Sequence, residues 1–344
     1  MYKRQFSIGA APAATLAPPA VGMYHSAYPD FVGTEDRVAA WRIREFERLV
    51  GKRLAWVYFS DNWMGRIRFP ARRVAVVHGM GRVPFIRMMA RSSWREGAAD
   101  PVYTLQRIVD GEFDADLTRW FEAARDSGVK MLVEFGTEVN GSWFPWSGRW
   151  NGGGTTAGYG DPALADGPER FRDAYRRLVD LSRAAGAANL TWVYHVNGGS
   201  QPRAAWNTPA AYYPGDAYVD WIGVSIYGSQ RPGEYYGSFR RQLDAVYPKL
   251  RALSRDKPLA VLEWGIAQRP ARGTKAGWIA AALRDLRARR WPRIRAVSYW
   301  HEDWLDPGDR RVDLRIDSSP RVRRAYRRGV ASGFFTSRPV WTPR

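Results

Sequence analysis

The chain reads MLVEFGTEVNGSWFPW over residues 131–146. Its first five residues are apolar apart from one glutamate, which is the composition of a buried strand. The run ends in Gly-Thr-Glu, and three aromatic residues and a proline follow within eight positions. The stretch therefore predicts a strand that delivers one carboxylate, Glu138, into an aromatic loop. Sugar rings stack on aromatic faces and a carboxyl group acts on a glycosidic oxygen, so this combination is typical of a carbohydrate site.

Short apolar runs alternate with amphipathic helical patterns along the rest of the chain. We expect strands over residues 20–24, 54–59, 83–89, 130–135, 190–194, 221–227, 259–263 and 295–300. Between them, apolar residues recur with the i, i+3, i+4, i+7 spacing of helices that bury one face, and Thr34, followed by Glu35 and Asp36, is typical of a helix start.

Eight alternating units predict the α/β class and a single (β/α)8 TIM barrel with elaborated loops at the C-terminal ends of its strands. An open doubly wound sheet is the alternative. It would be expected to carry a GxGxxG or P-loop motif after the first strand, and the sequence has neither there.

No shift in composition divides the chain, so we expect one catalytic barrel over residues 19–335. Residues 1–18 are expected to combine an artefactual start with a linker or the remnant of an export signal. The reasons are that residues 1–5, MYKRQ, resemble an adapter-derived sequence and that residues 10–20 are rich in Ala and Pro. Residues 336–344 are expected to form a tail. An export remnant would place the protein outside the cell or in the periplasm.

The net charge and the absence of cysteine limit the kinds of partner that the protein can have. The net charge is +19, but the basic residues are nearly all arginine and are interspersed with acids, which is typical of a solvated surface. A nucleic-acid-binding protein is the alternative that this charge leaves open. The chain has no cysteine and no apolar run approaching the roughly 18 to 20 residues of a membrane helix. We expect a monomer with a polysaccharide substrate, without nucleic acid or membrane partners, and without cofactor or metal.

In a TIM barrel the working groups stand at the C-terminal ends of the strands. Two carboxylates, Glu138 after the fourth strand and Glu263 on the seventh, would face one another there. Retaining glycoside hydrolysis uses two carboxyl groups roughly 5–5.5 Å apart. The pattern alone leaves open which group does which, and also leaves open a metal site. Other side chains expected at this end are His25, Asn62, Trp63, Arg87, Arg91, Asn140, Trp143, His195, Asn197, Tyr227, Trp264, Trp300, His301, Glu302 and Asp303.

The run GTEVNGSWFPW, residues 136–146, resembles the acid/base segment of glycoside hydrolase family 26, retaining endo-glycanases of clan A best known for β-mannanases. Residues 167–197 resemble the helix and fifth strand of that family, residues 212–228 its sixth-strand segment, and LEWG at residues 262–265 its nucleophile strand. The resemblance covers roughly residues 22–332.

The resemblance implies roles for five residues. Glu138 would be the acid/base and Glu263 the nucleophile. Trp143 would line the site beside the acid/base, Tyr227 would hydrogen-bond the nucleophile, and Trp300 would be a platform under the sugar. Neighbouring rings would raise the pKa of the acid by desolvation, and a tyrosine hydroxyl would keep the nucleophile ionised.

One position departs from the family pattern, which has histidine immediately before the acid/base where this chain has Thr137. A threonine hydroxyl reaches less far, so the departure weakens mannan as the substrate in favour of mixed-linkage β-glucan or β-1,3-xylan. His195 stands where the family has a small residue, and it is expected either to contact substrate or to be satisfied below the site. Asn140 is expected mainly to shape its loop.

Three further expectations complete the site. Trp63 and Trp146 could add stacking surfaces, and Glu134 is expected to pair with Arg87 inside the barrel. The expected function is a retaining endo-β-glycanase acting on β-mannan, mixed-linkage β-glucan or β-1,3-xylan. The alternatives are a non-catalytic polysaccharide-binding barrel and, because of Arg87, Arg91 and Arg149, a hydrolase of an acidic microbial exopolysaccharide.

Overall fold

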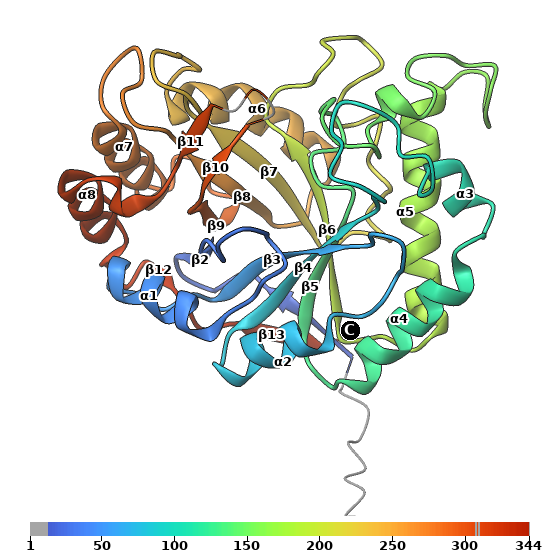
Figure 1. The fold of residues 1–344 in the computed structure, drawn as a ribbon, viewed down its shortest axis with the longest axis horizontal. Helices are drawn as coiled ribbons and strands as arrows, with labels where there is room; N and C mark the ends of the chain where they lie inside the picture. The colour runs from blue at the N-terminus through green and yellow to red at the C-terminus, as the bar shows by residue number, and fades with distance from the viewer. Residues whose placement is uncertain (1–12, 307, 309, 344) are drawn as a thin grey trace, which may run out of the picture.

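Eight parallel strands form a closed barrel (Figure 1). The computed structural model describes residues 13–306, 308 and 310–343, and the adapter-like residues 1–5 lie outside them. The ninth strand in chain order pairs with the second and closes the sheet, so the predicted TIM barrel is confirmed. The barrel strands are β2 Met23–Tyr28, β3 Trp56–Asn62, β4 Val83–Met89, β5 Met131–Phe135, β6 Leu190–Asn197, β7 Trp221–Tyr227, β8 Leu259–Gly265 and β9 Ile294–Trp300.

Helices surround the barrel and bury their apolar stripes against it (Figure 1). They are α1 Ala40–Val50, α2 Ala71–Gly79, α3 Leu105–Val109, α4 Asp114–Asp126, α5 Asp166–Ala184, α6 Phe239–Leu253, α7 Lys275–Arg287 and α8 Pro320–Val330. Short 3-10 turns occur at Gly148–Trp150 and Ile316–Ser318. The connection from β6 to β7, residues 198–220, runs through turns with no helix.

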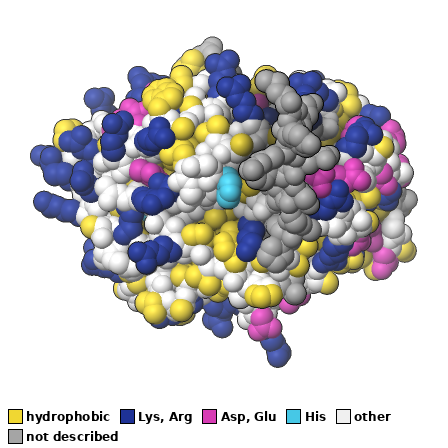
Figure 2. All heavy atoms as spheres, turned by 90° about the horizontal axis from the view of Figure 1, so that it is seen from below, with side chains coloured by type: hydrophobic (Ala, Val, Ile, Leu, Met, Phe, Trp, Pro, Cys, Tyr) yellow, Lys and Arg dark blue, Asp and Glu magenta, His cyan; other side chains and the backbone are white. Residues whose placement is uncertain are grey.

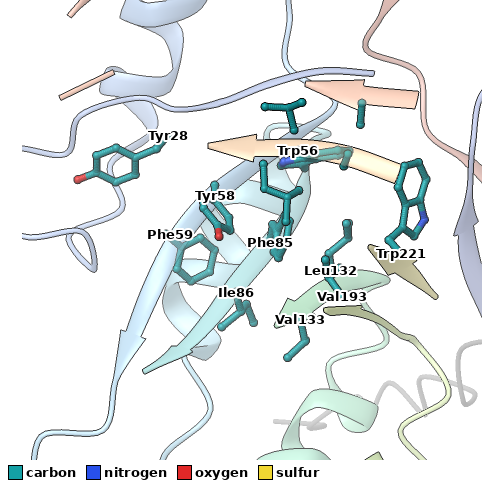
Figure 3. Close-up of a cluster of buried hydrophobic side chains, with 14 of the residues drawn as sticks. Tyr28, Trp56, Tyr58, Phe59, Phe85, Ile86, Leu132, Val133, Val193 and Trp221 are labelled. Carbon is teal, nitrogen blue, oxygen red and sulfur yellow. The ribbon is translucent and has the colours of Figure 1, made fainter. Parts of the chain in front are cut away.

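Aromatic rings pack with aliphatic side chains from neighbouring strands in a buried cluster of the barrel (Figure 3). Tyr58 and Trp56 both meet the ring of Phe85 edge-on, with ring centroids 4.5 Å and 5.9 Å apart. Two charged residues stand beside each other within this sheet, because Arg87 of β4 is in register with Glu134 of β5. The core therefore holds ionic groups directly beneath the C-terminal ends of the strands.

Two histidines expected at the mouth of the barrel are buried instead. Strand β2 begins at Met23 and not at residue 20, so His25 lies within the strand, with Nε2 2.9 Å from the Tyr326 hydroxyl. His301 accepts the backbone N–H of Ile316 at Nδ1, at 2.9 Å. Burial lowers the pKa of His25 to about 4 and that of His301 to about 3. Both are neutral structural residues near pH 7.

Short strands near the two ends of the described chain pair with each other. β1 Ala14–Ala17, within the expected linker, pairs antiparallel with β13 Val340–Pro343, within the expected tail. Leu16 of β1 also donates its N–H to Thr191 Oγ1 at 2.9 Å and accepts from Trp221 Nε1 at 2.7 Å. β12 Phe335–Thr336 adds to β2, while β10 Asp303–Leu305 and β11 Arg311–Asp313 form a hairpin after β9.

The surface carries mixed charge. Seen from below, from the side where β1 and β13 lie, Lys and Arg side chains are spread over the molecule with Asp and Glu among them (Figure 2). Several arginines pair with acids on the outer helices, as Arg177 does with Asp114 at 2.5 Å. No helix in the described part of the chain combines the length and the apolar character needed to cross a membrane.

Candidate active site

Glu138 stands three residues beyond the end of β5, in a backbone turn that few residues adopt. Its φ is +51°, and Gly136 before it has a φ of +69°. A side chain on Gly136 would lie 2.4 Å from the ring of Phe171, so the close approach of the helix also demands glycine. Left-handed backbone at a non-glycine residue is costly and clusters at functional sites, because packing around it must hold it in place.

The loop after β5 holds the Glu138 carboxyl by hydrogen bonds. Trp143 donates from Nε1 to Glu138 Oε2 at 2.7 Å, and Trp146 donates from Nε1 to the carbonyl of Thr137 at 2.7 Å. Asn140 ties the loop to the end of β6, since it donates to the carbonyl of Asn197 at 3.0 Å and accepts the Asn197 N–H at 2.7 Å. Asn140 is fully buried, so it shapes the loop.

Glu263 of β8 has two inequivalent oxygens. Its Oε2 accepts from the Tyr227 hydroxyl at 2.8 Å. Its Oε1 is buried and has no hydrogen-bond partner among the described residues, although Arg87 Nη2 lies 3.5 Å away. Glu263 as a whole is 4% exposed and Glu138 is 7% exposed. One oxygen is thus fixed while the other is available.

The electrostatics of Glu263 differ from the sequence-based expectation of a nucleophile that is simply ionised. Burial raises the pKa of Glu263 to about 7, Arg87 opposes this, and the Glu138 carboxylate adds to it. Two carboxyl groups that repel one another across a buried site cannot both be fully ionised without compensating cations. The balance of nearby positive charge therefore decides how much of Glu263 is ionised near neutral pH.

Arg87 is the centre of that balance. Its Nη1 donates to Glu35 Oε2 at 2.7 Å, and its Nε and Nη2 lie 3.5 Å from Glu134 Oε1 and Glu263 Oε1. The predicted pairing of Glu134 with Arg87 is confirmed. The guanidinium is buried, so it contacts these acids and is not presented to a ligand at the surface.

Thr137 and His195 lie beneath the two carboxyl groups and contact each other. Thr137 Oγ1 is 2.9 Å from His195 Nδ1, and that nitrogen is 3.0 Å from Glu134 Oε2. His195 Nε2 is 2.9 Å from Ser225 Oγ. Both residues are 1% exposed, so the structure leaves them no surface for a sugar. Of the two roles expected for His195, it matches the satisfied histidine below the site.

The aromatic residues expected at the site divide into two groups. Trp143 and Tyr227 are half-buried at the mouth. Trp300 is only 5% exposed, because it stacks on Tyr28 with centroids 4.3 Å apart and an interplanar angle of 17°. Trp63 and Trp146 are fully buried against Tyr103 and Phe144. Their faces are covered by protein, since aromatics at strand ends also fill the cores of the loops.

Some residues of the mouth were not singled out by the sequence. Glu35 resembled the first-turn acid of a helix, but α1 begins at Ala40, and Glu35 instead accepts from Arg87 and from Ser60. Trp94 is 54% exposed on the loop after β4, with the guanidinium of Arg91 4.5 Å from its ring centroid. The exposure of the Trp94 side chain could not be predicted from the sequence and is visible only in the structure.

The sequence leaves open the alternative of a metal site. It would use Glu134, His195 and Glu263, because one ligand atom of each lies within 4.8 Å of the others. Arg87 contacts both of these carboxylates. A fixed guanidinium at this place supplies part of the positive charge that a cation would otherwise bring, so the donor set fits an internal ion-pair network better than a metal site.

Comparison with known proteins finds similarity to glycoside hydrolases. Residues 105–253 match the model of glycosyl hydrolase family 26. Endoglucanase H of Acetivibrio thermocellus is 28% identical over 306 residues, which is 88% of this chain. The chain is similar to glycosyl hydrolase family 26 over residues 105–253. The family 26 match includes Glu138 and Tyr227 and ends before Glu263.

Other relatives show how far the likeness to known glycoside hydrolases extends. Beta-1,3-xylanase TXYA of Vibrio sp. is 28% identical over 127 residues, 37% of this chain. The chain spans 30% of the length of Endoglucanase H and 23% of that xylanase. A beta-mannanase from a symbiotic protist of the termite Reticulitermes speratus shares the fold with a TM-score of 0.58 and 16% identity, covering 97% of this chain and 98% of that one.

Proposed function

We propose that this chain is a member of family 26 and a retaining endo-β-glycanase, with Glu263 as nucleophile and Glu138 as acid/base. The observation that carries the proposal is the asymmetry of the Glu263 carboxyl. Oε2 is held by Tyr227, while Oε1 is buried with no hydrogen bond to any residue that the structure describes. A carboxylate oxygen left free in a dry site is suited to attack an anomeric carbon.

In the first step, Glu263 Oε1 forms a bond to the anomeric carbon while the bond from that carbon to the glycosidic oxygen breaks. Glu138 gives its proton to the departing oxygen, and Trp143, bonded to Oε2, leaves Oε1 of Glu138 to carry that proton. In the second step, Glu138 takes a proton from water, the water oxygen bonds to the anomeric carbon, and the bond to Glu263 breaks. The anomeric configuration is retained.

The proposed substrate is a neutral β-linked polysaccharide, with β-glucan placed before β-1,3-xylan and mannan. The relative that aligns with most of the chain bears the name endoglucanase, and a second is named a β-1,3-xylanase. An acidic polymer is less suited to the site, because Arg87 and Arg91 are buried and bonded to protein groups, and of the three arginines considered only Arg149 is exposed.

The proposal is tested by reducing-sugar release from mixed-linkage glucan, β-1,3-xylan, mannan and a uronate-containing polymer. Glu138→Gln and Glu263→Gln should each lower kcat on the best substrate by about 10³-fold or more, the scale expected when a reacting carboxyl is lost. Glu45→Gln, an exposed acid on α1 paired with Arg42, is the matched control and should behave as the parent.

Near-full activity of either variant would refute the assigned roles. Binding of polysaccharide by the parent without any turnover would instead support the non-catalytic alternative.

A further inference from the structure

The network beneath the proposed nucleophile contains more acids than Arg87 can balance. One guanidinium contacts Glu35, Glu134 and Glu263. Glu134 and Glu263 are almost completely buried. A buried carboxylate without a nearby cation pays a large desolvation cost, and it either takes up a proton or acquires a partner. The arrangement therefore calls for a second positive charge.

His195 lies where that charge is needed. Its Nδ1 is 3.0 Å from Glu134 Oε2, and an ionised carboxylate only accepts, so this nitrogen must carry a hydrogen. Its Nε2 is 2.9 Å from Ser225 Oγ, and a hydroxyl oxygen can accept from it. Both ring nitrogens thus face atoms that can receive a hydrogen bond, as a doubly protonated ring requires.

The other groups around His195 are acids or neutral hydroxyls. Thr137 Oγ1 and the Tyr58 hydroxyl lie 2.9 Å and 3.3 Å from Nδ1. Tyr58 also donates to Glu134. Arg87 lies on the far side of the Glu134 carboxyl, where it contacts Oε1 while His195 contacts Oε2.

The charges around the ring favour its protonated form. Burial lowers the pKa of His195, but the Glu134 carboxylate, with Glu263 and Glu138 adding to it, outweighs burial and raises that pKa above its usual value. His25 and His301 are also buried, and within the described part of the chain no carboxylate is among their hydrogen-bond partners. For these two histidines burial prevails. His25 and His301 therefore serve as internal references for a buried, neutral imidazole, with which His195 can be compared.

We propose that His195 is a buried imidazolium whose charge balances Glu134, leaving Arg87 to hold Glu263 in its ionised, nucleophilic form. This role rests on the proposed function of Glu263. His195 is a positioning residue: at 1% exposure it acts through Glu134 and Arg87 and touches no substrate. Its charge also lowers the pKa of Glu263, so its loss raises that pKa and leaves Glu263 protonated up to a higher pH.

The first test observes the proton directly and needs no substrate. The chain has only four histidines, so nitrogen NMR of the histidine rings in the full-length protein can be assigned with His195→Gln as the reference spectrum. At about pH 8, where a histidine of ordinary pKa has lost its charge, His195 should show two protonated nitrogens. His25 and His301 should each show one.

A single protonated nitrogen on His195 would overturn the proposal, whatever the enzyme does. Conversely, His195 could prove to be charged while the Glu263→Gln variant remains active. That result would support the imidazolium and refute the proposed function. The two failures are therefore distinguishable.

The second test follows the acidic limb of kcat/KM against pH, which reports the ionisation of the free enzyme. His195→Gln should move this limb to higher pH by about one unit, as expected for removal of a nearby charge. Glu134→Gln/His195→Gln, which removes both charges, should return the limb toward that of the parent. Melting curves establish that each variant is folded.

A purely structural histidine predicts a different pattern. His195→Gln would then lower kcat without moving the limb, and the double variant would be worse than either single one. That result would contradict the proposal. If His195→Gln does not fold, the NMR measurement on the parent, assigned by Glu134→Gln perturbation, still decides.

Discussion

At the scale of single residues, the Tyr227 hydroxyl distinguishes the two oxygens of Glu263. Tyr227→Phe removes this bond and frees Oε2 to rotate, so we expect kcat/KM to fall about 10- to 100-fold, the loss typical of a hydrogen bond to a charged group. Steady-state kinetics on the best glycan measure this effect. Tyr159→Phe is the matched control, because its hydroxyl bonds Asp173 on the outer surface, and it should leave kcat/KM within about twofold. Equal effects of the two changes would contradict the role of Tyr227.

At the scale of elements, the turn from β5 into its loop places Glu138. Gly136→Ala would put a Cβ 2.4 Å from Phe171 at a φ of +69°, so we expect a loss of roughly 2–4 kcal/mol in unfolding free energy. Activity should also fall, because the strained turn would relax and move Glu138. Chemical denaturation and kinetics measure the two effects. Gly79→Ala, on α2 with open space around it, should change neither by much, and a tolerated Gly136→Ala would contradict this account of the turn.

The sequence predicted the strands well for a physical reason. Barrel strands are buried on both faces, so they read as apolar runs, and all eight were found in order. The start of β2 was not predicted. The role of Glu35 was not predicted either, because a threonine followed by acids has the same local pattern whether a helix begins at once or six residues later. Arg87 and Ser60, which lie far from Glu35 in the sequence, hold its carboxylate at the mouth.

Side-chain direction limited the prediction of the site in the same way. Glu138, Glu263, Trp143 and Tyr227 were expected together, and hydrogen bonds join them as two pairs. Trp63 and Trp146 have the same residue type and the same kind of position, yet they face the loop core. The sequence shows that an aromatic residue follows a strand, but the direction of its side chain depends on packing against residues distant in the sequence.

At the scale of the whole molecule, β1 and β13 join the two ends of the described chain across the end of the barrel away from Glu138 and Glu263. Removal of residues 338–344 should therefore lower the Tm by about 2–8 °C, if the pairing contributes about 1–2 kcal/mol in a chain of this size. The value of kcat/KM at temperatures where both forms are folded should stay within about twofold. Thermal melts and kinetics on the parent and the shortened chain test this, and loss of activity in a folded shortened chain would be the contrary outcome.

The account depends most on Glu263 forming a covalent bond to the sugar. The most direct measurement is mass spectrometry of Glu138→Gln after reaction with an activated aryl β-glycoside, because without its acid/base the second step is slow and the glycosyl-enzyme accumulates. The account predicts one added glycosyl unit per chain, carried by the peptide that contains Glu263. A glycan-cleaving parent whose Glu138→Gln variant shows no adduct, or an adduct on another residue, would contradict it.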